Sequence, residues 1–173
     1  MKTNKTIFYV QAALIAALYV VLTAVSNLFG LASYAIQVRF SEALTILPFF
    51  TPAAIPGLFV GCILSNFLTG CMLPDIIFGS LATLLGAIGT YLIGKSARKP
   101  NAPLKKAKKW MAPLPPILSN TLIIPLILAY VYNFEGGIPY FMLTVGIGEI
   151  ISCGILGMIL FFPMEKIAAK LFR

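Results

Sequence analysis

The chain has 173 residues, of which 60% are hydrophobic and only 10% charged, and its mean hydropathy is +0.96. Soluble domains carry about 25% charged residues, so this composition excludes an ordinary soluble protein and indicates an integral membrane protein. The chain has no histidine, which excludes histidine acid–base catalysis and the usual zinc sites. Its net charge of +8 comes from basic residues between apolar runs, so we expect no nucleic-acid partner.

Apolar runs of membrane-spanning length dominate the sequence. Because a transmembrane helix needs about 20 apolar residues, we predict an all-α integral membrane protein in which residues 1–173 form one bundle of six transmembrane helices. The helices are expected over about 7–28, 36–50, 53–69, 74–94, 114–132 and 138–163. The second run reaches only about 22 Å as an α-helix, so we expect it to be tilted, kinked or aided by buried irregular backbone.

Basic residues predict the orientation of these helices, because short loops rich in Lys and Arg remain in the cytoplasm. They gather near the N-terminus, in the loop 95–113 and near the C-terminus. All three groups lie on one side only if an even number of helices separates them, and six helices meet this condition. We therefore expect both termini and the basic loop 95–113 to be cytoplasmic.

A second set of charged residues falls in the predicted outer half or within the membrane. Charged side chains are costly in hydrocarbon and usually face a bundle interior or a water-filled cavity, so these residues are candidates for function. The set consists of Arg39, Glu42, Asp75, Glu135 and Glu149.

Two features that suggest metal or nucleotide chemistry are interpreted structurally. The cysteines Cys62, Cys71 and Cys153 lack metal-ligand spacing, so we interpret them as packing residues and expect no metal site. Residues 89–96, GTYLIGKS, have the letters of a phosphate-binding loop. They continue an apolar helix whose backbone N–H groups are already used, so we predict a helix end and no ATP binding.

Small residues spaced four apart allow helices to approach closely. Gly57 and Gly61 form such a pair, and for them we favour packing within the bundle. The first helix has two overlapping pairs, which serve either internal packing or docking of a partner: Ala12, Ala13, Ala16 and Ala17.

Polar residues near the predicted outer ends suggest a ligand site. Arg39 and Glu42 lie one helical turn apart, where an ion pair either pins a short helix or lines a ligand mouth. Asn66 and Asp75 flank the same external turn, although Asp75 also suits the start of a helix. Glu149 lies about 15 Å below Pro139 along a helix.

Glu149 is therefore near the bilayer centre. There it must be protonated, hydrogen-bonded to a group such as Asn120, or paired with a ligand.

Several stretches resemble a known family. Residues 37–48 read QVRFSEALTILP, residues 51–62 read TPAAIPGLFVGC and residues 75–87 read DIIFGSLATLLGA. Together with the alanine-rich first helix, they resemble the queuosine-precursor transporter family (QueT), whose members are substrate-binding S components of energy-coupling factor (ECF) transporters.

The resemblance implies a multi-pass protein of the prokaryotic plasma membrane that captures a micronutrient from outside. It implies a transmembrane coupling subunit (T component) and two ATPase subunits as partners. These ATPases hydrolyse the ATP, so the chain itself is expected to have no cofactor, no catalytic residue and no enzymatic activity. The family's alanine-containing helix surface docks on the coupling subunit, which assigns that role to Ala12, Ala13, Ala16 and Ala17.

The implied substrate is a deazaguanine such as preQ1, which carries an aminomethyl arm, or queuine. A carboxylate can accept the adjacent N–H donors of a guanine-like edge, and a second acid suits the protonated amine. We predict Glu149 in one of these roles and Glu42 or Asp75 in the other. The other predicted contacts are Arg39 at the ligand mouth and Asn66 and Asn120 reading polar atoms. Tyr34, Phe40 and Tyr140 serve either as stacking or lid residues or as anchors at the membrane interface.

Other classes remain as alternatives. The nearest is an S component for a different micronutrient, because such bundles share an architecture and differ in their pocket residues. A small integral-membrane lipid enzyme is a more distant alternative, since the sequence offers no paired-acid metal motif and no nucleophile with a base. A channel is disfavoured because channels usually need rings of polar residues from several chains.

Overall fold

The computed structural model describes residues 5–31, 37–98 and 105–171, and among these residues the regular secondary structure is helical, with no strand. The prediction of an all-α chain is therefore confirmed for them. The elements in chain order are α1 (Lys5–Leu28), the 3₁₀ helix η1 (Phe40–Phe49), α2 (Ala54–Leu68), α3 (Leu73–Ala97), α4 (Lys105–Trp110), α5 (Leu114–Tyr130), α6 (Ile138–Glu149), the π-helical segment η2 (Ile150–Leu156) and α7 (Gly157–Leu171).

Within the described part of the chain, four stretches are long and apolar enough to cross a membrane: Lys5–Leu28, Leu73–Ala97, Ala107–Tyr130 and Ile138–Ala168. They match the predicted first, fourth, fifth and sixth helices. The sixth runs through η2 into α7, as the predicted range 138–163 requires, and ends a few residues later than predicted. The third predicted helix is present as α2, but its 15 residues are short for a crossing. The count of six crossings and the orientation of the termini stay predictions.

The prediction of an α-helix over 36–50 is wrong. Residues 40–49 instead form the 3₁₀ helix η1, with Pro48 inside it. Proline has no backbone N–H and disrupts an α-helix interior, and the tighter 3₁₀ helix is used in short pieces. Nine consecutive residues of η1, from Ser41 to Phe49, are buried, so this segment lies in the core.

The predicted basic loop 95–113 is only partly a loop. Helix α3 continues to Ala97, and α4 occupies Lys105–Trp110. Lys109 forms an ion pair with Glu165 of α7, and the rings of Trp110 and Phe162 pack edge to face with centroids 5.8 Å apart. The basic segment is therefore tied to α7.

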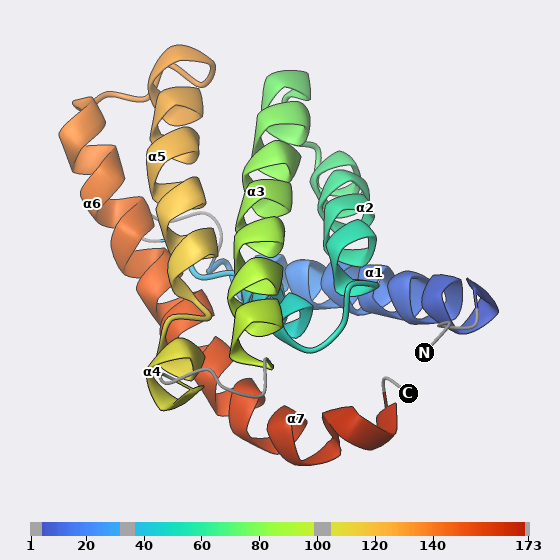
Figure 1. The fold of residues 1–173 in the computed structure, drawn as a ribbon. Helices are drawn as coiled ribbons and strands as arrows, with labels where there is room; N and C mark the ends of the chain where they lie inside the picture. The colour runs from blue at the N-terminus through green and yellow to red at the C-terminus, as the bar shows by residue number, and fades with distance from the viewer. Residues whose placement is uncertain (1–4, 32–36, 99–104, 172–173) are drawn as a thin grey trace.

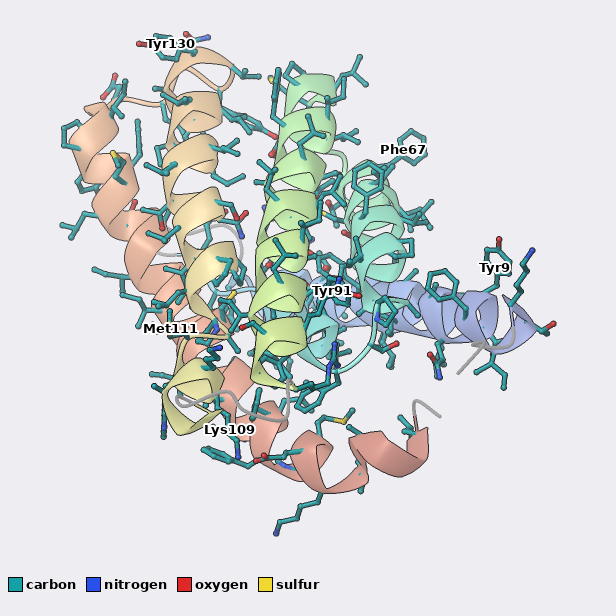
Figure 2. All side chains as sticks on the ribbon, viewed as in Figure 1. Tyr9, Phe67, Tyr91, Lys109, Met111 and Tyr130 are labelled. Carbon is teal, nitrogen blue, oxygen red and sulfur yellow. The ribbon has the colours of Figure 1, made fainter. Side chains whose placement is uncertain are left out.

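Helices α2, α3, α5 and α6 lie side by side, while α1 runs crosswise behind α3 and packs against α2, and α7 runs beneath their lower ends in the view of Figure 1. Tyr130 and Lys109 mark opposite ends of the α4–α5 pair, and Tyr9 and Phe67 point away from the bundle (Figure 2). Tyr9 and Phe67 are both at least two-thirds exposed, as expected for side chains that face lipid.

The core surrounds η1. Ile46 of η1, Leu58 of α2 and Phe161 of α7 are fully buried in one cluster. A smaller cluster, formed by Leu128, Phe141 and Val145, joins α5 to α6. The core therefore holds η1 between α1, α2, α3 and α7, and the candidate site lies above it.

Candidate functional site

A cavity of about 630 Å³, which we call the large chamber, lies where α3 begins and α5 ends. Its volume falls within the range of pockets that hold small molecules. Its walls come from α1, α2, α3, α5, α6 and the segment before η1. Among the lining residues are charged and aromatic side chains, namely Arg39, Asp75, Tyr132, Phe134, Glu135, Tyr140 and Phe141.

Asp75 is the buried acid of the large chamber, with 7% of its surface exposed. Its Oδ2 accepts a hydrogen bond of 2.9 Å from the Tyr132 hydroxyl, whose oxygen accepts one of 3.2 Å from the Met72 backbone N–H. Burial raises the pKa of the Tyr132 phenol to about 12. Tyr132 therefore stays protonated at neutral pH and serves as a fixed donor to Asp75.

Asn66 meets Asp75 over a glycine of α3. A Cβ atom built on Gly79 would lie 3.2 Å from Asp75 Oδ1 and 3.3 Å from Asn66 Nδ2, so the two polar groups converge on the space that the missing side chain leaves. Both residues line the large chamber. The two residues that flank the turn between α2 and α3 in the sequence therefore line the same cavity.

A second cavity, which we call the inner cleft, has a volume of only about 20 Å³. This volume suffices for about one water-sized group. Gln37, Arg39 and Ile124 line both cavities, so the inner cleft adjoins the large chamber. Two acids, Glu42 and Glu149, line the inner cleft.

Glu42 is 2% exposed and is held by a tyrosine of α1. Its Oε1 accepts a hydrogen bond from the Tyr19 hydroxyl. Its Oε2 is buried and has no hydrogen-bond partner among the described residues. A buried acceptor without a donor is costly, which makes this oxygen a candidate contact for a ligand donor.

The sequence allowed an Arg39–Glu42 ion pair, and the described part of the chain does not contain one. Arg39 is the N-cap of η1 with an extended backbone, φ −109° and ψ 114°, and its carbonyl oxygen accepts a hydrogen bond of 3.1 Å from the Glu42 backbone N–H. The two residues are thus joined by one turn of the backbone, but their side chains do not form an ion pair. Instead, Arg39 Nη1 donates to Asn66 Oδ1 over 3.5 Å. Arg39 thus joins the polar group of the large chamber.

Glu149 is hydrogen-bonded through both oxygens. Asn120 Nδ2 donates to its Oε1 over 2.9 Å, and Cys153 Sγ donates to its Oε2 over 3.1 Å. The sequence-based suggestion of an Asn120 contact is confirmed. Ligand atoms of Glu42, Glu149 and Cys153 lie within 4.8 Å of one another, so this cluster also has the geometry to hold a cation, and the absence of a metal site stays a prediction.

Comparison with known proteins identifies the family. The family model described as QueT transporter matches residues 9–166. The chain belongs to this family. The Queuosine precursor transporter QueT of Lactococcus lactis subsp. cremoris is 41% identical over 85 residues, which are 49% of this chain and 50% of that relative. The chain thus spans about half the length of the curated relative it matches, and no solved structure matches it.

Membership in the QueT family places the chain among transporters, and its four helices of membrane-crossing length make it a multi-pass protein. We therefore assign it to the prokaryotic cell membrane. Residues 89–96, with the letters of a phosphate-binding loop, lie inside α3. The interpretation of these letters as part of a helix is confirmed.

The alanines of this QueT family member lie on two faces of α1. Ala16 is buried, and Ala12 is half-buried. A Cβ atom on Gly57 of α2 would lie 2.7 Å from the Ala12 carbonyl oxygen, and one on Gly61 would lie 3.1 Å from Ala16 Cα. The predicted packing role of both glycines is confirmed.

The other two alanines of α1, Ala13 and Ala17, are exposed. They share a face of α1 with Leu14 and Leu18, which are 60% and 44% exposed. No other described helix buries this face.

The predicted aromatic contacts divide in the structure. Tyr140 is half-exposed and lines the large chamber. Phe40 lines neither described cavity, and its backbone N–H donates to Ser26 Oγ over 2.8 Å. Tyr34 lies outside the described residues.

Sequence reasoning missed Tyr19, Gln37 and Tyr132. A tyrosine in the middle of an apolar helix is itself a signal, because a buried Tyr hydroxyl usually finds a partner.

Proposed function

We propose that this QueT family member is the substrate-binding S component of an ECF-type importer and captures a queuosine precursor, a deazaguanine such as preQ1 or queuine. The observation that carries the proposal is the large chamber adjoining an acid-lined inner cleft. The family match and the name of the Lactococcus relative point to the same substrate class.

The chemistry of the site suits a cationic deazaguanine. A guanine-like edge presents adjacent N–H donors, and a carboxylate accepts two such donors at once. The amine of preQ1 needs a second acid. Asp75 of the large chamber and the pair Glu42 and Glu149 of the inner cleft supply both kinds of acceptor.

Transport energy is proposed to come from partners. A T component and two ATPase subunits would form the importer, with ATP hydrolysed by the ATPases and no cofactor or catalytic step in this chain. Ala13 and Ala17 are the alanines free to dock on the T component, since they are exposed while Ala16 is buried against α2. The docking proposal is therefore narrowed to the exposed face of α1.

The importer model includes six membrane crossings with both termini in the cytoplasm. Helix α2 and segment η1, at 15 and 10 residues, would complete the four longer helices. A reporter fused at Pro103 tests this topology. A cytoplasmic reporter is expected, and an extracellular one would overturn the arrangement.

Ligand binding is the direct test of the substrate. The protein is purified in detergent, any co-purified small molecule is identified by mass spectrometry, and preQ1, queuine and guanine are titrated by calorimetry. Saturable binding of a deazaguanine is expected. Failure of all deazaguanines to bind would refute the substrate, and saturable binding of an unrelated micronutrient would favour an S component of different specificity.

Docking is tested with a matched pair of substitutions on α1. Ala13→Leu should prevent copurification with the T component and ATPases while ligand binding by the isolated chain is retained. Ala16→Leu should destabilise the isolated chain, because Ala16 is only 7% exposed and overpacking a tight interface costs about 1–3 kcal/mol. If Ala13→Leu left assembly intact, the exposed alanine face would not be the docking surface.

A further inference from the structure

The two adjoining cavities differ too much in size to accept the same part of a ligand. The large chamber, at about 630 Å³, accommodates a bicyclic ring, whereas the inner cleft, at about 20 Å³, accommodates one water-sized group. An ammonium group has that size. A ring lying in the large chamber can therefore reach the inner cleft only with a short arm.

The inner cleft also contains more acidic than basic side chains. Among the described residues that line it, Arg39 supplies one guanidinium, while Glu42 and Glu149 supply two carboxyl groups. The nearest hydrogen-bond partner of the Arg39 guanidinium is Asn66 of α2, so this cation is directed toward the polar group of the large chamber. One cationic group in the inner cleft would balance the remaining carboxylate.

A specific acceptor is available for such a cation. Glu42 lines the inner cleft and is only 2% exposed, and its Oε2 has no hydrogen-bond partner among the described residues. An ammonium group has three N–H donors and no acceptor. Charge-assisted bonds to carboxylates are stronger than bonds between neutral groups, so Glu42 and Glu149 suit an ammonium better than a neutral ring edge.

We propose that the ligand binds in one orientation, with its primary ammonium arm in the inner cleft between Glu42 and Glu149 and its ring in the large chamber. This inference rests on the proposed function, because it names the orientation of the deazaguanine. The ring edge then faces Asp75, whose carboxylate accepts its adjacent N–H donors. Arg39 and Asn66 lie beside Asp75 and can donate to the ring carbonyl.

The orientation is tested with two ligands that differ only in the arm. The first is preQ1, and the second is 7-methyl-7-deazaguanine, which keeps the ring and replaces the ammonium arm with a methyl group. Their affinities are measured by calorimetry for the wild type, Glu149→Gln, Glu42→Gln and Asp75→Asn. Wild-type protein should prefer preQ1 by about tenfold or more, which is the strength of one or more hydrogen bonds to a charged group.

Glu149→Gln and Glu42→Gln should each weaken preQ1 by about tenfold and leave the methyl analogue within about twofold, so that the preference is lost. Asp75→Asn should weaken both ligands equally and keep the preference. Two cleft variants are used because either one alone can also disturb folding. Glu165→Gln is the control, since it removes an acid of α7 that lines neither cavity and should leave the affinity for both ligands unchanged.

The opposite pattern would overturn the orientation. If the cleft variants weakened both ligands equally and Asp75→Asn abolished the preference, the ring edge would lie on Glu149 and the arm on Asp75. That result would leave the proposed function intact, because the deazaguanines would still bind. If the wild type bound neither ligand, the proposed function itself would fail.

The same geometry sets specificity among the precursors. Queuine carries a ring substituent on its amine, and a 20 Å³ cleft has no room for that substituent. We expect preQ1 to bind about tenfold or more tightly than queuine. Equal affinity for the two would show that the arm does not enter the inner cleft.

Discussion

The large chamber and the inner cleft share the lining residues Gln37, Arg39 and Ile124 but differ in volume and in the hydrogen bonding of their acids. In the large chamber, Asp75 already has a donor in Tyr132, and about 630 Å³ of space remains. In the inner cleft, about 20 Å³ remains, and Glu42 keeps one buried oxygen without a donor. In the proposed orientation, the chamber selects a ligand by its shape and ring edge, while the cleft selects it by its charge.

Substitution of Gly148 should have the largest effect on stability and binding, because it displaces Gln37, which lines both cavities. A Cβ atom on Gly148 of α6 would overlap the Gln37 carbonyl oxygen, and a backbone atom cannot move aside as a side chain can. Gly148→Ala should lower the free energy of unfolding by about 3 kcal/mol. It should also weaken every ligand.

The control for this substitution is Gly146→Ala, two residues earlier on α6. Its new Cβ would lie 3.5 Å from Thr121 Cγ2, an ordinary contact, and alanine favours a helix over glycine by up to about 1 kcal/mol. Thermal unfolding in detergent compares the two variants. Equal melting temperatures would show that the contact between α6 and Gln37 is not tight.

Tyr19→Phe should affect the inner cleft next most strongly. The substitution removes the hydroxyl that donates to Glu42 Oε1, while Oε2 already has no hydrogen-bond partner among the described residues. A loss of about 1–3 kcal/mol in unfolding free energy is expected. Tyr130→Phe, at a position 71% exposed, should change it by less than about 0.5 kcal/mol, and a similar loss in both would argue against a special role for Tyr19.

Tyr132→Phe is the equivalent change in the large chamber and should cost less, about 1 kcal/mol, because Tyr132 is only half-buried. Its ligand affinity should fall for preQ1 and the methyl analogue alike, since Asp75 is expected to face the ring. Calorimetry with both ligands measures this. A loss confined to preQ1 would place the arm near Asp75 instead.

The high-pH behaviour of Tyr132 gives a spectroscopic test of the same bond. Because burial raises the pKa of Tyr132 to about 12 in the folded state, against about 10 in the unfolded chain, its contribution to stability is complete below pH 10. That contribution is lost as the pH rises through 12. The difference between wild-type and Tyr132→Phe absorbance titrations of tyrosinate should show one phenol titrating near 12, and a midpoint near 10 would contradict the Asp75 contact.

Thiol labelling should give the smallest perturbation and compare the cavities directly. Cys71 lines the large chamber and is partly exposed, whereas Cys62 is only 1% exposed and lines the inner cleft. A maleimide should label Cys71 first, and a bound ligand should slow that reaction severalfold. Mass spectrometry locates the label, and faster reaction at Cys62 would show that the inner cleft is open.

Helix α3 shows what the sequence could predict. Its long apolar run begins beside Pro74 and ends in basic residues, and the observed helix Leu73–Ala97 differs from the predicted 74–94 by a few residues. Segment η1 shows what it could not. Its polar residues Ser41, Glu42 and Thr45 are buried like their apolar neighbours. The polar pattern therefore does not mark an exposed face from which the helical period could be read, and the sequence does not distinguish 3₁₀ from α geometry.

The site was predictable where residues lie close along the chain. Asn66 and Asp75 flank one turn, and their meeting over Gly79 follows from that connection. The contact of Tyr19 with Glu42 depends on how α1 crosses the bundle (Figure 1). No local pattern encodes that crossing, so the partner of Glu42 could be found only in the structure.

Segment η1 connects the inner cleft to the basic end of the bundle. Glu42 lies near its start, and at its end the carbonyl oxygens of Phe49 and Phe50 accept hydrogen bonds of 3.0 and 2.9 Å from Arg98 Nη1. Ten residues of 3₁₀ helix measure about 20 Å, and close packing along this length leaves little room to bend. Glu42 and Arg98, on opposite sides of the core, are therefore joined by one continuous segment of buried backbone.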